Sequence, residues 1–291
     1  MYKLRNWINP NKINWISLSK NPNAIRLLEK NQNKINWYGL SENPNAIQLL
    51  ENNLNKIKWR VLCLNPNAIH LLEKNLHKIH WDYLSDNPNS IQLLEKYPDK
   101  INWSALSCKS NAIHILEKNL DKIDWKQLSR NSNAIQLLED NIDRIDWEML
   151  SSNPNAIHLL EKYPDKIDWY RLSENPNAIH ILENNLDEID WDCLSSNPNA
   201  IYRILENNLD KIEWDCLSSN PNAIYILEKN QDKIDWNRLS ENPSIFEYDY
   251  KAMRESKDEI HKELKEYIFN PKNESKWFNL GLTDDEGYLF I

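Results

Sequence analysis

The sequence predicts an all-α fold, an α-solenoid of about ten 22-residue two-helix repeats with a C-terminal capping helix. Three observations lead to this prediction: a tryptophan recurs every 22 residues, an Asn-Pro-Asn signal lies between two short apolar patterns in each period, and the 291 residues include only 3 glycines. A fixed period of roughly 20–50 residues is the signature of solenoids, in which each repeat contacts only its neighbours. The scarcity of glycine argues against Gly-rich phosphate-binding loops.

The tryptophan ladder defines the period. Its members are spaced 22 residues apart, with one step of 23 before Trp214, and they are Trp15, Trp37, Trp59, Trp81, Trp103, Trp125, Trp147, Trp169, Trp191, Trp214 and Trp236. The Leu three residues after each Trp shares its helix face, so we expect both to pack in one continuous core. A stacking surface for bases or sugars is the alternative. Core packing is favoured because Leu and Ile partners recur with the same period.

Each repeat divides into two short helices. The first begins at the residue before Trp, which is an Asp capable of N-capping in later repeats, such as Asp124. It ends before Asn-Pro, because the residue before proline avoids the α region. The second begins with Asn21 as N-cap and Pro22 at the first helical position, with Asn23 as an alternative cap. It is expected to end at Asn31 in a left-handed conformation.

The chain ends depart from the repeat. Residues 1–12 contain a shortened repeat that we expect to cap the N-terminus, residues 13–244 form the solenoid, and residues 245–291 form a capping helix and tail. An amphipathic pattern from Phe246 predicts a helix of about 24 residues that ends before Pro271. Packed helices lie about 8–10 Å apart, so ten repeats predict a rod or superhelix about 80–100 Å long.

Charge is unevenly distributed along the chain. The net charge is −9, but residues 1–100 carry 14 basic and 8 acidic side chains, whereas the remainder is strongly acidic. A rod with this distribution has a positive and a negative end, which suggests self-association. Four cysteines without a C-x-x-C pair, and no secretory signal, indicate an intracellular protein. No apolar run is long enough to span a bilayer, so no membrane partner is expected.

The repeat motif resembles that of a known group of proteins. The segment Leu-Ser-x-Asn-Pro-Asn-Ala-Ile-x-Leu/Ile-Leu-Glu, as in 150–161 and 172–183, and the end pattern Ile245-Phe246-Glu247-Tyr248-Asp249-Tyr250 with Asn270-Pro271 and Lys276-Trp277 carry the likeness. They resemble repeat proteins encoded by large nucleocytoplasmic DNA viruses (giant viruses). The resemblance covers nearly the whole chain and implies a viral origin and a repeat fold rather than an activity. It also implies a location in host cytoplasm or viral factory, or in the virion.

One variable row is the candidate binding surface. The position after Ala-Ile holds long or planar polar side chains of changing identity, and it includes His70, His114, His158, His180, Tyr202 and Tyr225. A core would not need this variation, whereas a binding face of a solenoid would. An ordinary solvated face remains the alternative. No metal is expected, because one repeat step of about 10 Å is too long for two zinc ligands at about 2 Å.

Two further features stand beside this row. Arg203 is a single inserted residue, which a helix absorbs as a π-bulge at a functional site or tolerates as drift. A glutamate ladder (Glu29, Glu51 and their equivalents) and a lysine ladder (Lys34, Lys56 and their equivalents, broken by Glu188) run along the repeats. We expect each glutamate to bond a lysine or an amide of its own or a neighbouring repeat.

These patterns predict a non-enzymatic scaffold that mediates protein–protein interaction. No phosphate loop and no nucleophile–base pair at useful spacing are present, so neither a catalytic residue nor a cofactor is expected. A structural component of a virus particle is the first alternative. A nucleic-acid-binding solenoid is the second, and the sequence pI of about 5.4 argues against it.

Overall fold

The computed structural model describes residues 1–201 and 203–268, which form two compact bodies. The repeat body comprises Leu4–Phe246, and the terminal body comprises Met1–Lys3 and the chain from Glu247 onward. Helices recur with the 22-residue period along the repeat body, as the sequence predicts. The tail predicted at residues 272–291 lies outside the described residues.

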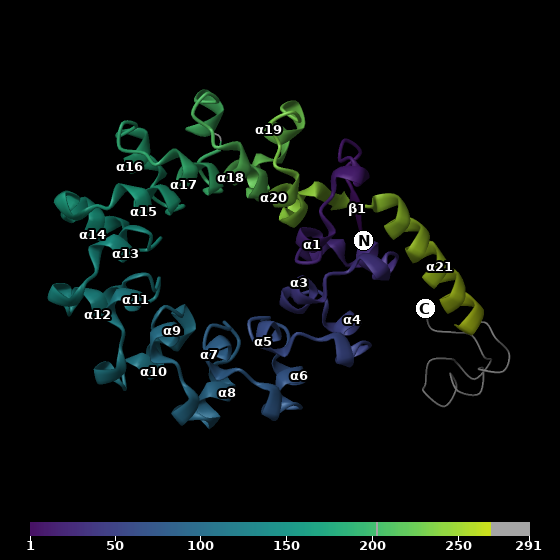
Figure 1. Ribbon diagram of the computed structural model, residues 1–291, viewed down its shortest axis with the longest axis horizontal. Coiled ribbons are helices and arrows are strands. Elements are labelled where there is room, and N and C mark those ends of the chain that lie inside the picture. Colours follow the sequence, from purple (N-terminus) through teal and green to yellow (C-terminus); the bar gives the residue numbers. More distant parts are fainter. Residues whose placement is uncertain (202, 269–291) are drawn as a thin grey trace, which may run out of the picture. The chain divides into compact units, whose positions relative to one another are not determined.

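Every repeat begins with a short helix at its tryptophan, and these helices form the inner layer of the repeat body (Figure 1). They are α1 (Trp15–Leu18), α3 (Trp37–Glu42), α5 (Trp59–Leu62), α7 (Trp81–Leu84), α9 (Trp103–Ser107), α11 (Trp125–Ser129), α13 (Trp147–Ser151), α15 (Trp169–Glu174), α17 (Trp191–Ser196), α18 (Trp214–Ser219) and α20 (Trp236–Glu241). We number the repeats 1 to 11 by these helices.

The second helices form the outer layer (Figure 1). They are α2 (Ile25–Glu29), α4 (Ile47–Glu51), α6 (Ile69–Glu73), α8 (Ile91–Lys96), α10 (Ile113–Leu116), α12 (Ile135–Glu139), α14 (Ile157–Lys162), α16 (Ile179–Glu183) and α19 (Ile224–Lys229). Repeat 9 has only a 3₁₀ turn at this place, η11 (Leu205–Asn207).

Short 3₁₀ turns connect the layers. Those before the inner helices are η1 (Pro10–Lys12), η3 (Gln32–Lys34), η4 (Leu54–Lys56), η5 (Leu76–Lys78), η6 (Pro98–Lys100), η8 (Leu120–Lys122), η9 (Ile142–Arg144) and η10 (Pro164–Lys166). Those at the Asn-Pro signal are η2 (Pro22–Ala24), η7 (Ser110–Ala112), η12 (Pro221–Ala223) and η13 (Pro243–Ile245).

The helix caps follow the sequence in most repeats. The Asp124 carboxylate accepts from the amide of Gln127, and Asp146, Asp168, Asp190 and Asp235 cap their helices in the same way. The Asn21 side chain accepts from the amide of Asn23, with Pro22 at the first position, as predicted. Such caps stabilise a helix by about 1 kcal/mol each.

The predicted left-handed cap at Asn31 is wrong. Its φ of −132° lies outside the left-handed region, and its side chain donates to the Leu27 carbonyl at 2.9 Å. Tyr97 and Tyr163 have nearly the same backbone angles, which explains why tyrosine replaces asparagine there. The position needs an unusual negative φ rather than a left-handed residue.

The core lies between the two helix layers. Leu18 of α1 and Leu28 of α2 are fully buried, as are their equivalents in the other repeats. The ladder tryptophans are only half-buried, so each contributes one part of its indole to the core. Helices of four to six residues are far too short to be stable alone, and this packing between neighbours stabilises them.

The repeat body closes into a ring, so the predicted rod or superhelix is wrong. Inner helices α1 and α20 pack against each other although about 220 residues separate them in sequence. The Asn14 amide donates to the Ser240 hydroxyl at 2.9 Å, as the Asn36 amide donates to Ser19 one repeat later. Repeats 11 and 1 are therefore neighbours, and the positive and negative stretches lie around a ring rather than at two ends.

Repeat 11 is assembled from both ends of the chain. Residues 236–245 supply its inner helix and Asn-Pro turn, and residues 8–14 supply its closing 3₁₀ turn. The Lys12 ammonium lies 4.9 Å from the Trp236 ring centroid, as Lys34 lies 4.4 Å from Trp15. The N-terminal segment thus supplies the closing turn of the last repeat, which has no second helix among the described residues.

The terminal body contains a small sheet and the C-terminal helix. Strand β1 (Tyr2–Leu4) pairs with β2 (Phe246–Tyr248), and Tyr2 stacks on Tyr248 with ring centroids 5.0 Å apart. The predicted helix is present as α21 (Tyr250–Ile268), but it starts later than expected because Phe246 belongs to β2. No helix among the described residues has the length and apolar character required to cross a membrane.

Candidate functional site

A ladder of buried asparagines joins each repeat to the one before it. Each Nδ2 donates to two backbone carbonyls of the preceding repeat; Asn43, for example, bonds the Ser19 and Asn21 carbonyls at 3.1 and 2.8 Å. The ten members are Asn21, Asn43, Asn65, Asn87, Asn131, Asn153, Asn175, Asn197, Asn220 and Asn242. Lys109 occupies the eleventh position, in repeat 5. This row holds the ring together and is not available to a partner.

The serine row has the same structural role. Each hydroxyl accepts the amide that precedes the next Trp, and nearly all also donate to the Trp carbonyl of their own helix, as Ser41 does with Lys58 and Trp37. In repeat 3 a cysteine replaces the serine, and the Cys63 thiol makes both contacts at 3.2 and 3.4 Å. The loss of serine there therefore does not open the repeat.

Among the described residues no glutamate of the glutamate ladder pairs with a member of the lysine ladder, although Glu73 bonds Lys96 of the next repeat at 3.4 Å, as expected. The basic side chain lies over the Trp ring of its own repeat; Lys56 over Trp37 at 4.6 Å is one example. In repeats 4 and 7 a tyrosine packs against the tryptophan instead, with Tyr97 5.0 Å from Trp81. The lysine ladder thus covers the exposed part of the tryptophan ladder.

The glutamates pair with the predicted binding row. The His70 Nε2 lies 3.0 Å from Glu51 of the preceding repeat, and His114, His158 and His180 make the same contact with Glu95, Glu139 and Glu161 at 2.9–3.1 Å. The four histidines are about half exposed on the outer layer. The row is therefore a chain of lateral contacts between repeats as well as an accessible surface. Tyr202 lies outside the described residues, and Tyr225 is half-buried.

The insertion at Arg203 changes the local hydrogen bonding. The Leu205 amide donates to the Ala200 carbonyl, and the Glu206 amide to the Ile201 carbonyl, which are both i→i−5 bonds. These bonds accommodate the extra residue, but repeat 9 has the 3₁₀ turn η11 where other repeats have a second helix, so the insertion is not the bulge within a helix that was expected. The Arg203 guanidinium lies 3.2 Å from Glu183 and replaces the histidine–glutamate contact of other repeats.

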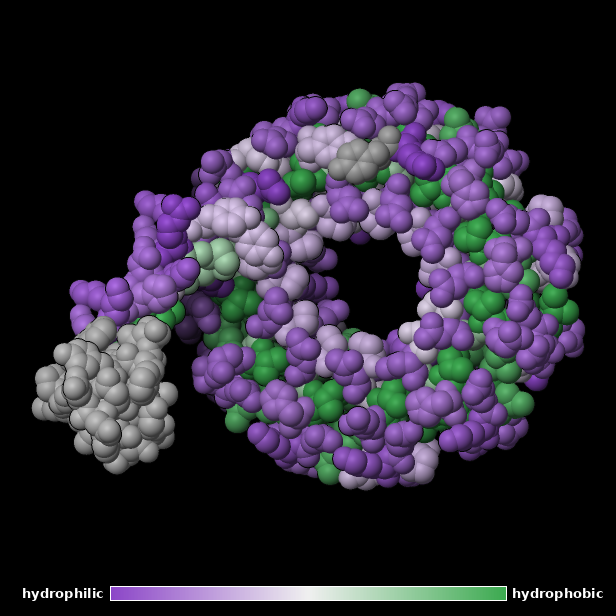
Figure 2. Space-filling view, turned by 180° about the vertical axis from the view of Figure 1, so that it is seen from behind, coloured by the Kyte–Doolittle hydropathy of each residue, from purple (hydrophilic) through white to green (hydrophobic). Residues whose placement is uncertain are grey.

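A second variable row, which sequence reasoning missed, lies on the inner layer. We call it the inner row: it consists of the residue that follows each ladder tryptophan, and all its members are exposed. It comprises Ile16, Tyr38, Arg60, Asp82, Ser104, Lys126, Glu148, Tyr170, Asp192, Asp215 and Asn237. Each lies about 200° around its helix from the buried Leu, on the side turned from the core. The space-filling view shows an open hole through the ring (Figure 2).

Neighbouring side chains of the inner layer contact one another across repeats. The Arg60 guanidinium lies 4.5 Å from the Tyr83 ring, and Lys126 reaches Asp146 and Glu148 at 3.9 and 4.0 Å. These contacts are exposed and individually weak, at about 0–1 kcal/mol. They orient the inner side chains without contributing much to the fold.

The thiols of the inner layer are held in the protonated form. Burial raises the pKa of Cys193 to about 12, with added effects of Asp190 and Glu174. Burial also raises the pKa of Cys63 and of Cys216. A thiolate is the reactive form of cysteine, so these side chains act as packing groups near neutral pH.

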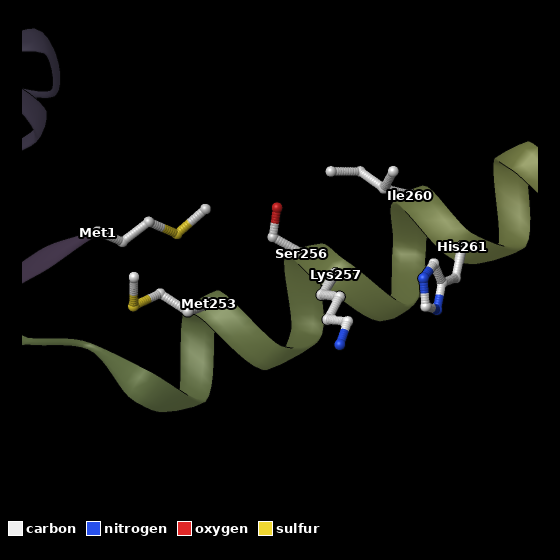
Figure 3. Close-up of a pocket in the computed structure, with 6 residues that line it drawn as sticks. All are labelled: Met1, Met253, Ser256, Lys257, Ile260 and His261. Carbon is white, nitrogen blue, oxygen red and sulfur yellow. The ribbon is translucent and has the colours of Figure 1, made fainter.

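Shallow hollows occur among the described residues. One of about 360 Å³ lies on the repeat body between repeats 8 and 9, where Pro176, His180 and Arg203 contribute to its wall. Another, of about 370 Å³, lies in the terminal body, where Met1 lies beside Met253 and Ser256 of α21 (Figure 3). Neither brings together three side chains of the kinds that hold a metal ion, and no such group occurs elsewhere among residues 1–201 and 203–268.

Comparisons of the chain with protein-family models, with curated proteins and with solved structures find no match.

Proposed function

We propose that the protein is a non-enzymatic scaffold, encoded by a large DNA virus, whose ring binds another protein through the inner row. The observation that carries the proposal concerns two adjacent positions of the same helix. The first position is Trp in all eleven repeats, whereas the next holds eight different residue types, all exposed. Exposed positions tolerate many residue types, so it is the exposed Ile16, Tyr38 and Tyr170 in this row that favour a binding surface over a merely solvated face.

The composition of the inner row favours a protein partner. Ile16 and Tyr38 lie on the adjacent helices α1 and α3 with 61% and 55% of their surface exposed, and Tyr170 is 51% exposed. Exposed aromatic and aliphatic side chains beside charges of both signs are typical of protein interfaces. The row lacks the uniformly basic character that phosphate backbones require.

The test is quantitative affinity capture from extracts of virus-infected cells with two matched variants. Tyr38→Ala/Tyr170→Ala removes two exposed side chains of the inner row, and Leu54→Ala/Leu120→Ala removes two of similar exposure (51% and 47%) from the 3₁₀ turns. We expect the first variant to lose the specific partner and the second to retain it.

Three outcomes would contradict the proposal. Equal capture by both variants would exclude the inner row as the binding surface. Nuclease-sensitive capture with a steep salt dependence would favour a nucleic-acid partner. Recovery of the chain only as a stoichiometric part of purified particles, with no partner lost in either variant, would favour a structural component.

A further inference from the structure

Trp169 differs from every other ladder tryptophan in what lies over its ring. Eight of the others have a lysine or arginine cation 4.1–4.9 Å from the ring centroid, and Trp81 and Trp147 have a tyrosine at 5.0 and 5.1 Å. Within the described part of the chain, Trp169 has neither a cation nor a ring over it. Its indole is half-buried, so part of it is accessible.

The cause is a reversal of charge at Glu188. This position is Lys or Arg in the ten other repeats, including Lys12 for repeat 11, and it is acidic only in repeat 8. Glu188 is exposed, and it follows Asp187, which is exposed as well. Repeat 8 therefore keeps the aromatic half of a cation–π pair and replaces the cation with a carboxylate.

The chain around Glu188 is also acidic. Between Arg171 and Arg203 the sequence contains six acidic residues and no lysine or arginine. No ion pair is formed by Asp187 or Glu188 among the described residues. Arg171 and Arg203 pair with Glu174 and Glu183 of this stretch, whereas no described basic side chain neutralises Asp187 and Glu188.

We propose that Trp169 and Glu188 form a binding site for a cationic side chain, lysine or arginine, of a partner polypeptide. Eight other repeats supply the template, since each places an ammonium or guanidinium group over the equivalent ring. In repeat 8 the partner supplies this cation, and Glu188 and Asp187 add an attraction that the other repeats lack. This inference rests on the proposed protein-binding function and identifies one contact that the partner makes.

The strength of these contacts suits one contact within a larger interface. A cation–π contact at an exposed site strengthens binding about 2- to 5-fold, and an exposed ion pair adds about the same factor or less. One such site binds a free alkylammonium ion weakly, but it contributes selectivity when the rest of a partner is bound.

The experiment titrates the full-length protein with n-butylammonium, which represents a lysine side chain, and observes the tryptophan indole N–H resonances by NMR. Trp169→Phe assigns the resonance of interest. We expect the Trp169 signal to shift progressively with n-butylammonium concentration, no comparable shift of the other ladder signals, and no such shift of the Trp169 signal with neutral 1-butanol.

Two reciprocal variants make the test specific to the site. Glu188→Lys restores the lysine of the other repeats, and we expect it to cover Trp169 and to abolish the response. Lys211→Glu uncovers Trp191 in repeat 9, and we expect it to create a second responsive signal. Equal shifts at all tryptophans, no shift at Trp169, or an unchanged response in Glu188→Lys would overturn the proposal. Each of these results leaves the inner-row capture experiment as a separate test of the proposed function.

Discussion

Two junctions between repeats can be compared: the one that closes the ring and the one between repeats 4 and 5. The first has no peptide connection but keeps its asparagine hydrogen bonds, whereas the second has the peptide connection but lacks those bonds. At the closing junction, which no peptide bond crosses, Asn21 donates to the Ser240 and Asn242 carbonyls at 3.1 and 2.9 Å. Between repeats 4 and 5 the chain is continuous, but Lys109 replaces the asparagine and both buried bonds are missing. The side-chain ladder, rather than the order of the chain, decides how strongly neighbouring repeats hold together.

The size of the difference follows from ordinary magnitudes. A buried hydrogen bond contributes about 1 kcal/mol, so the junction between repeats 4 and 5 lacks about 2 kcal/mol. Lys109 forms an ion pair with Asp86 at 3.2 Å, but the Asp86 side chain is 48% exposed and solvent weakens the attraction. We therefore expect the ring to open first between repeats 4 and 5, and not where the chain ends meet.

The largest expected effect comes from breaking the closing junction. Asn21→Ala removes two buried bonds to repeat 11 and the cap on Asn23, and it leaves two carbonyls unpaired. We expect the free energy of unfolding in urea to fall by about 3 kcal/mol.

Asn153→Ala is the matched internal variant, because Asn153 makes the same contacts to Ser129 and Asn131. If the closing junction is equivalent to an internal one, Asn21→Ala and Asn153→Ala lower the free energy of unfolding by similar amounts. A loss of less than about 0.5 kcal/mol for Asn21→Ala alone would show that repeats 1 and 11 do not hold together in solution.

Hydrogen exchange compares the two junctions in the unmodified protein. We expect backbone amides of residues 102–112 to exchange about 30-fold faster than those of residues 14–24, which corresponds to a difference of about 2 kcal/mol in the free energy of opening. Faster exchange at residues 14–24 would place the weak point at the closure instead.

Restoring the ladder should strengthen the weaker junction. Lys109→Asn allows bonds to the Ser85 and Asn87 carbonyls while it removes the exposed pair with Asp86. We expect Lys109→Asn to raise the free energy of unfolding in urea by about 1–2 kcal/mol. The control, Lys118→Asn, replaces an exposed lysine of the same repeat and should leave that free energy unchanged. Loss of stability in Lys109→Asn would mean that the backbone at this junction cannot accept the ladder.

The smallest effect concerns the cations over the tryptophans. Lys12→Met and Lys34→Met each remove one ammonium from a Trp ring and keep the aliphatic stem. We expect equal losses of about 0.5–1 kcal/mol, because Lys12 serves repeat 11 as Lys34 serves repeat 1. An effect confined to Lys34→Met would argue that the N-terminal segment is not part of repeat 11.

The period, the two helices and their caps follow from the sequence because they depend on local signals, such as Asp124 before Trp125 or Asn21 before Pro22. Closure depends on the small rotation between repeats, which no local signal specifies. A clue was present in the two ends: residues 9–13 match the last part of a repeat, and residues 236–243 match the first part. Placed side by side, they supply a repeat that is complete except for its second helix.

The candidate surfaces were likewise predictable from the sequence only where they do not depend on packing between repeats. The sequence identified the outer histidine row, but not that His70 and its equivalents pair with glutamates of the preceding repeat. Glu188 was visible as a break in the basic ladder, yet its meaning depends on the packing of lysines over tryptophans. Aligning the repeats column by column also reveals the inner row, because Ile16, Tyr38 and Arg60 share one position.

The most direct test of the closed ring measures two distances, each between a pair of spin labels, by double electron–electron resonance. One variant carries spin labels at positions 33 and 232, in repeats 1 and 10, and the other at positions 33 and 77, in repeats 1 and 3. All three positions are exposed and lie at equivalent places in their turns, and the four free cysteines are replaced by serine. The ring separates both pairs by two junctions, so it predicts closely similar distances. An open rod separates positions 33 and 232 by about nine steps of about 8–10 Å, and a distance of about 70–90 Å for that pair would contradict the closed ring.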